Sequence, residues 1–199
     1  CSLLNSVIHS IGTYKQLILI SNTSFSGKHK VHQSITSCYF LRLLSCSFKS
    51  QSHSNRLYLI KVSHVRNIYI QNSIIFNCSV PAVLVKRCIS LLMDKLILSN
   101  LNVLMQITSR IFVAFKFVDI IKINIMNCLF LNIYSPVAAI SRINHASLAN
   151  NTFELCQAPL SAHITGPNSS ILLIDCIFVN CSTIIKMGVV NIIFSKIDI

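Results

Sequence analysis

Acidic residues are scarce in this chain of 199 residues. It contains 5 Asp and Glu against 17 Lys and Arg, which gives a formal net charge of +12. Charged residues make up only 11% and hydrophobic residues 53%, so the composition excludes extended disorder and coiled coils. No run approaches the roughly 18 consecutive apolar residues of a membrane-spanning helix. The length suits one domain or a short repeat array.

What the chain does contain is an internal repeat. Each copy of the repeat, called the phrase below, has eight consecutive positions. They are an apolar residue, any residue, an apolar residue, any residue, Asn or a substitute, two further residues, and a large apolar residue called the anchor. The anchors are Phe25, Phe48, Ile75, Val103, Phe130, Phe153 and Phe178. They are separated by 23, 27, 28, 27, 23 and 25 residues, a mean of about 25.5. A degraded eighth copy consists of Ile192, Phe194, Lys196 and Ile199.

The pattern within each copy is that of a β-strand, because apolar residues occupy every second position. Pro81, Pro136 and Pro159 each lie six residues after an anchor and mark a bend, since proline cannot donate to a sheet ladder. A further apolar segment follows, so each period holds about three short strands and has no room for a helix. We therefore predict an all-β solenoid of about eight stacked coils, whose equivalent strands pair in parallel about 4.8 Å apart.

This arrangement resembles the right-handed parallel β-helix of pectin-lyase-like proteins, whose coils have a similar length and an asparagine ladder at one corner. The resemblance implies a structural ladder of side chains that satisfy backbone groups at the bend. Its members here would be Asn22, Asn72, Asn100, Asn127, Asn150 and Asp175, with Ser45 as a substitute.

Two phrases, Asn127-Cys128-Leu129-Phe130 and the segment 175–180, are also similar to repeats of polymorphic surface and autotransported adhesins. The Gly-Gly-Ala-Ile element of those adhesins is absent, and their Phe-x-x-Asn becomes Phe-x-Asn at 130 and 178. Residues 1–199 form a single β-helix segment in this interpretation. Because both ends fall in mid-coil without a polar cap, and the sequence starts at Cys1 with no signal-like segment near it, we expect the segment to belong to a longer chain.

The nine cysteines include no Cys-x-x-Cys pair, which argues against a structural zinc site. Their recurrence at fixed distances from the anchors favours small buried residues that stack from coil to coil. Cys156 and Cys181 occupy the same position in neighbouring coils and are the candidates for a disulfide.

The positive charge is concentrated in the first half, where residues 1–100 hold 11 basic residues and 1 acidic residue. Such a surface attracts acidic polysaccharides, anionic headgroups or nucleic acid. Lys86 and Arg87 form the longest basic cluster and are the candidate contacts for a polyanion. No aromatic residues are interleaved with them, which argues against a nucleic-acid site.

Five Asn-x-Ser/Thr sequons occur, at Asn22, Asn77, Asn150, Asn168 and Asn180. Asn22 and Asn150 are predicted ladder residues, where a glycan would not fit. Asn168 lies beside Gly166-Pro167 in a turn-like stretch and is the preferred candidate for glycosylation.

The acids argue against a catalytic role. Polysaccharide lyases and hydrolases of this fold use clustered carboxylates, calcium-binding acids or a catalytic Arg or Lys. Here Asp94, Asp119, Glu154, Asp175 and Asp198 are scattered over different coils, and we assign no catalytic, metal or cofactor residues.

We expect a non-catalytic structural or adhesive segment of a larger secreted or cell-surface protein. Outward apolar positions such as Leu19, Tyr69 and Leu172 indicate that neighbouring chains or domains cover part of the exterior. The first alternative is a carbohydrate-active or polyanion-binding module. The second is an organellar or intracellular assembly subunit, with reduced cysteines.

Overall fold

The computed structural model describes residues 2–4, 7–11, 16–27, 32–50, 58–102, 113–165, 170–182 and 190–195. All regular elements in these ranges are β-strands, and every strand pairing is parallel. The predicted all-β solenoid is therefore confirmed.

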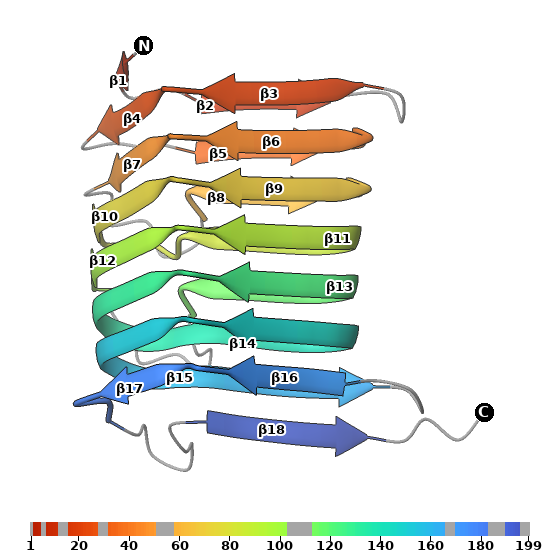
Figure 1. Ribbon diagram of the computed structural model, residues 1–199. Helices are drawn as coiled ribbons and strands as arrows, with labels where there is room; N and C mark the ends of the chain where they lie inside the picture. The colour runs from red at the N-terminus through yellow and green to blue at the C-terminus, as the bar shows by residue number, and fades with distance from the viewer. Residues whose placement is uncertain are drawn as a thin grey trace, which may run out of the picture.

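The strands form three stacks that run the length of the molecule (Figure 1). Stack 1 contains β1 (Ser2–Leu4), β4 (Ser24–Gly27), β7 (Ser47–Ser50), β10 (Ile74–Cys78), β12 (Ile97–Leu101) and β17 (Ile177–Val179). Stack 2 contains β2 (Val7–Ile11), β5 (His32–Thr36), β8 (Ile60–Ser63) and β18 (Val190–Ser195). Stack 3 contains β3 (Leu17–Ser21), β6 (Phe40–Leu44), β9 (Asn67–Gln71) and β16 (Ser170–Ile174).

Four longer strands turn the corners between the stacks. Strands β11 (Val83–Asp94) and β13 (Phe115–Met126) pass from stack 2 into stack 3. Strand β14 (Leu129–Ala149) passes through all three stacks, and β15 (Thr152–Thr165) through stacks 1 and 2. The chain thus visits each stack once per turn, and each coil has three sides.

One residue with positive φ, between 49° and 58°, lies at each described bend. This left-handed conformation turns the chain sharply and is best tolerated by Asn and Asp among residues with a side chain. The corner between stacks 3 and 1 (the 3–1 corner) has Asn22, Ser45, Asn72, Lys95, Asn127, Asn150 and Asp175. The corner between stacks 1 and 2 (the 1–2 corner) has Asn77, Asn100, Asn132, Leu155 and Asn180. The corner between stacks 2 and 3 (the 2–3 corner) has Ser37, His64, Arg87, Asp119 and Arg142.

The anchors stack inside the coils, as their spacing predicts. The rings of Phe25 and Phe48 are 4.8 Å apart and nearly parallel. Phe130 lies 4.6 Å from Phe153, which lies 4.9 Å from Phe178. Burial of these large side chains in one column, with β-branched and leucine side chains around them, gives the solenoid a continuous apolar core.

One anchor was predicted in the wrong register. The strand pairing places Leu98 between Ile75 and Phe130, whereas Val103 lies outside the described residues. The fourth copy of the phrase therefore contains Leu91 and Met93, which pair with Ile68 and Ile70. The phrase fits this part of the chain in two registers five residues apart, and only the contact with the preceding coil distinguishes them.

The eighth copy is also a wrong assignment. Ile192 pairs with Ala162 and Phe194 pairs with Ile164, so β18 belongs to stack 2. The repeat predicted a strand of stack 3, which precedes a 3–1 corner. The solenoid consequently has about six turns instead of about eight.

Candidate functional site

The described carboxylates do not gather into one site. Asp119 at the 2–3 corner forms an ion pair with Arg142, whose Nε lies 2.8 Å from Asp119 Oδ1. Asp94 Oδ1 accepts a hydrogen bond of 2.9 Å from Asn127 Nδ2 near the 3–1 corner. The other two described acids are Glu154 on stack 1 and Asp175 at the 3–1 corner, and Asp198 lies outside the described residues. Within the described ranges, no three His, Cys, Asp or Glu side chains are close enough to hold a metal ion.

The predicted ladder residues line the 3–1 corner, with one exception. Their side chains are exposed, and Asn150 Nδ2 donates to Asn127 Oδ1 at 3.4 Å, so the described ladder bonds join side chains rather than backbone groups. Asn100 lies instead at the 1–2 corner, where its Oδ1 accepts a bond of 3.2 Å from Asn132 Nδ2. The position in the 3–1 corner that was predicted for Asn100 is occupied by Lys95, because the fourth coil has the shifted register described above.

A largely buried column that was not predicted from the sequence lies next to the 3–1 bend, and its polar members bond to backbone groups there. It consists of the residue after each corner position, namely Thr23, Cys46, Ser73, Leu96, Cys128, Asn151 and Cys176. Asn151 is fully buried, accepts from the Cys128 backbone N–H and donates to the Ile125 carbonyl, both at 2.9 Å. The signal was available, since a small or polar residue follows the corner in six of the seven coils.

All eight described cysteines lie directly after a corner residue and face the interior. The thiols near the 3–1 and 1–2 corners contact backbone carbonyls; Cys156 Sγ, for instance, lies 3.4 Å from Phe130 O. Burial raises the thiol pKa to about 12 for Cys88 and Cys156 and to about 11 for Cys128. Cys156 and Cys181 occupy neighbouring coils of one column, and both thiols are free in the structure.

A shallow basic depression lies on the 2–3 corner. It has a volume of about 250 Å³ and is lined by His64, Val65, Arg66, Arg87 and Ile89. Arg87 Nη1 lies 3.2 Å from His64 Nε2, and the Arg66 guanidinium lies 5.1 Å from the centroid of the Tyr39 ring. No carboxylate is among its described lining residues, and Asp119, which follows Arg87 in the corner column, is paired with Arg142.

The predicted polyanion contacts lie beside this depression. Lys86 is the last residue of the stack 2 part of β11, and Arg87 is the corner residue that follows it. Both side chains are exposed. The structure therefore brings Arg87 together with His64 and Arg66, which are distant from it in the sequence, while Lys86 lies directly before Arg87 and outside the lining of the depression.

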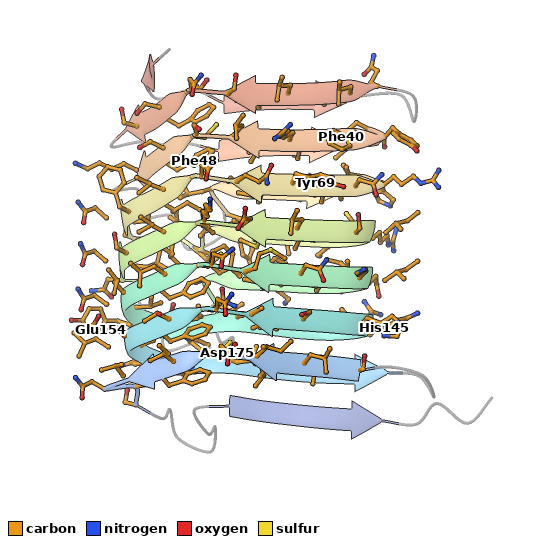
Figure 2. The ribbon with its side chains drawn as sticks, in the orientation of Figure 1. Phe40, Phe48, Tyr69, His145, Glu154 and Asp175 are labelled. Carbon is orange, nitrogen blue, oxygen red and sulfur yellow. The ribbon has the colours of Figure 1, made fainter. Side chains whose placement is uncertain are left out.

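The outer face of stack 3 carries exposed apolar side chains. Leu19, Tyr69 and Leu172 lie in one outward column, and Leu19 and Leu172 are 58% and 54% exposed. Tyr69 stacks on Phe40 of the neighbouring coil with ring centroids 4.9 Å apart (Figure 2). Arg42, Asn124 and Ser147 lie between them in the same column, so the strongly exposed apolar side chains of this face are on the terminal strands β3 and β16.

The comparisons with known proteins assign no relative. No protein family matches the chain, and neither a curated protein nor a solved structure matches it. Within the described ranges, no helix has the length and apolar character needed to cross a bilayer.

Proposed function

We propose that this chain is a non-catalytic β-helical scaffold, structural or adhesive, within a larger secreted or cell-surface protein or assembly. The observation that carries the proposal is the outer face of stack 3 at its two described ends, where Leu17 and Leu19 on β3 and Leu172 and Ile174 on β16 are 46–66% exposed. Large exposed apolar patches are typical of surfaces that another protein covers.

The distribution of the acids supports a non-catalytic role. Glycoside hydrolases place two carboxylates about 5–10 Å apart, on either side of the reacting bond. In this chain Asp94 and Asp175 belong to coils three steps apart at the same corner, and the Asp119 carboxylate is held by Arg142.

The partner surface can be tested on the natural protein. We expect native mass spectrometry of the source material to find the chain in a larger assembly, with cross-links to the partner on the outer face of stack 3. Leu172→Ser should weaken that contact. The matched control is Ile177→Ser on stack 1, since Ile177 is 55% exposed and Leu172 is 54% exposed. A free 22 kDa monomer that turns over a glycan would contradict the proposal.

The second candidate function is binding of an acidic polysaccharide or another polyanion. The basic depression of the 2–3 corner favours it, because Arg66 contacts Tyr39, Arg87 contacts His64, and the neighbouring Asp119 is already paired with Arg142. Such binding depends on salt, since each neutralised charge releases counterions.

Reversal of the charges of Lys86 and Arg87, the two predicted contacts, tests this candidate function. We expect the chain to bind a heparin-like polymer, and we expect sodium chloride to weaken this binding. The double variant Lys86→Glu with Arg87→Glu should abolish it. The control is Lys49→Glu with Lys95→Glu, which makes the same change in net charge on stack 1 and at the 3–1 corner. Equal losses for the two double variants would show a nonspecific effect of net charge and remove the site.

A further inference from the structure

Four of the five sequons lie at corners of the solenoid. Asn22 and Asn150 are at the 3–1 corner, and Asn77 and Asn180 are at the 1–2 corner. All four side chains are exposed, and Asn22 and Asn150 lie in the corner column predicted as the ladder. Asn168, the candidate preferred from the sequence, lies outside the described residues. Exposure by itself does not separate the four corner sequons.

The hydrogen bonds of the side-chain amides do separate them. Asn150 Nδ2 donates to Asn127 Oδ1 at 3.4 Å, and Asn22 also has an interaction partner. In the described part of the chain, the amides of Asn77 and Asn180 have no bonding partner. The middle residue of each of their sequons, Cys78 and Cys181, turns toward the interior. The asparagine at each bend is thus presented to the solvent with its amide nitrogen unoccupied.

We infer that Asn77 and Asn180 are sites of N-glycosylation. The inference rests on the proposed function, because the modification occurs in the secretory pathway. The donor would be an oligosaccharide joined by its anomeric carbon to a lipid diphosphate. Asn Nδ2 forms the new bond to that carbon, the bond from the carbon to the diphosphate oxygen breaks, and the Nδ2 proton passes to the leaving diphosphate or to solvent.

The solenoid gives both glycans room. Asn77 and Asn180 are separated by four coil steps along the 1–2 corner, roughly 19 Å at about 4.8 Å per step. The 1–2 corner is also the corner opposite stack 3 in the three-sided coil. Glycans at these two positions therefore leave the outer face of stack 3 accessible to a partner.

The test is secretion of the full 199-residue chain from a eukaryotic cell line, behind a cleavable signal. We expect two glycans by intact mass, and conversion of residues 77 and 180 to aspartate that carries heavy oxygen when a peptide-N-glycosidase hydrolyses the Asn–glycan amide bond in labelled water. Asn77→Gln and Asn180→Gln should each remove one glycan. Ser79→Ala and Ser182→Ala should do the same while retaining the corner asparagines. Asn100→Gln and Asn132→Gln are controls, because they lie in the same column outside any sequon.

Two outcomes would overturn the inference alone: a secreted chain unlabelled at residues 77 and 180, or label only at Asn22, Asn150 or Asn168. The natural protein distinguishes failure of this inference from failure of the proposed function. Its recovery from the cytosol without glycans would overturn both the inference and the proposed function. Its recovery from the cell surface with unmodified Asn77 and Asn180 would overturn only the inference.

Discussion

At the scale of single residues, the bends combine an exposed residue of positive φ with a buried residue that follows it. Asn150 and Asn151 illustrate the pair. The first is exposed, with its amide bonded to Asn127, and the second is buried, with its amide bonded to two backbone groups of the preceding coil. Buried backbone groups need such partners because water does not reach them.

Replacement of Asn151 by alanine should therefore destabilise the fold. The variant leaves the Cys128 N–H and the Ile125 carbonyl without side-chain partners in a buried site, and we expect a loss of about 2–4 kcal/mol in the free energy of unfolding. Urea unfolding followed by circular dichroism measures it. Asn144→Ala is the control, since Asn144 is exposed, and its effect should stay within about 0.5 kcal/mol. Similar losses for both variants would contradict the role assigned to Asn151.

The buried thiols predict sensitivity to alkaline pH. Burial raises the pKa of Cys88, Cys128 and Cys156 above the ordinary value of 9.0, so in the folded state these thiols keep their protons at a pH where the unfolded chain releases them. Stability is therefore full below about pH 8 and falls as the pH rises through 9 toward 11, by up to about 1.4 kcal/mol per pH unit for each thiol.

Urea midpoints measured at pH 7.5, 9 and 10 check this prediction. Cys88→Val should make the decline less steep, because valine has no proton to release and Val65 already occupies the same column in the neighbouring coil. An unchanged pH dependence in this variant would mean that other groups cause the decline.

At the scale of the elements, each bend depends on one residue that accepts positive φ. At the 3–1 corner this residue is Asn, Asp or Ser in every described coil except one, where Lys95 has a φ of 52°. A long side chain in this conformation is strained by about 1–2 kcal/mol relative to the right-handed region, whereas Asn tolerates it. Lys95 is thus a position at which the local sequence opposes the fold.

Lys95→Asn should stabilise the chain by about 0.5–1 kcal/mol, because it relieves this strain at an exposed position next to Asn127 in the column. Chemical denaturation provides the measurement. Lys116→Asn is the matched control within strand β13, where asparagine is disfavoured, and we expect no gain from it. A gain at Lys116 equal to that at Lys95 would indicate an effect of charge rather than of backbone conformation.

At the scale of the whole molecule, stability comes from contacts between successive coils. Leu148 and Leu173 pair in adjacent coils of stack 3 and both point inward. Leu148 is 1% exposed and Leu173 is 38% exposed, because no described strand pairs with β16 on its far side. The same residue type at the same position of the coil is therefore buried to very different extents.

Truncation of these two leucines measures that difference. Leu148→Ala should cost about 2–5 kcal/mol by removing buried surface and leaving a cavity, while Leu173→Ala should cost about 1 kcal/mol. Hydrogen exchange should also be faster in β16 and β17 than in β9 and β13. Equal losses for the two variants would mean that the coil with Leu173 is covered in solution.

Much of the fold could be predicted because the repeat spacing reports it directly. Stacked coils require equivalent residues at nearly constant intervals, so Phe130, Phe153 and Phe178 were found without a structure. The fourth anchor and the eighth copy could not, since alternating apolar residues fit more than one register and say nothing about which stack a strand joins. The candidate sites were harder to predict, because Arg87 lies beside His64 and Arg66 only through the stacking of coils.

The amino-acid sequence by itself determined that this chain builds β-strands, that they recur about every 25 residues, and that its apolar anchors form one core. Those properties follow from local alternation and spacing, which are present before folding. The tertiary structure alone decided which corner each asparagine occupies, whether its amide is bonded or available, and which basic residues share a surface. Such properties depend on register between coils, and a shift of a few residues in one strand changes them while the pattern of apolar residues stays the same.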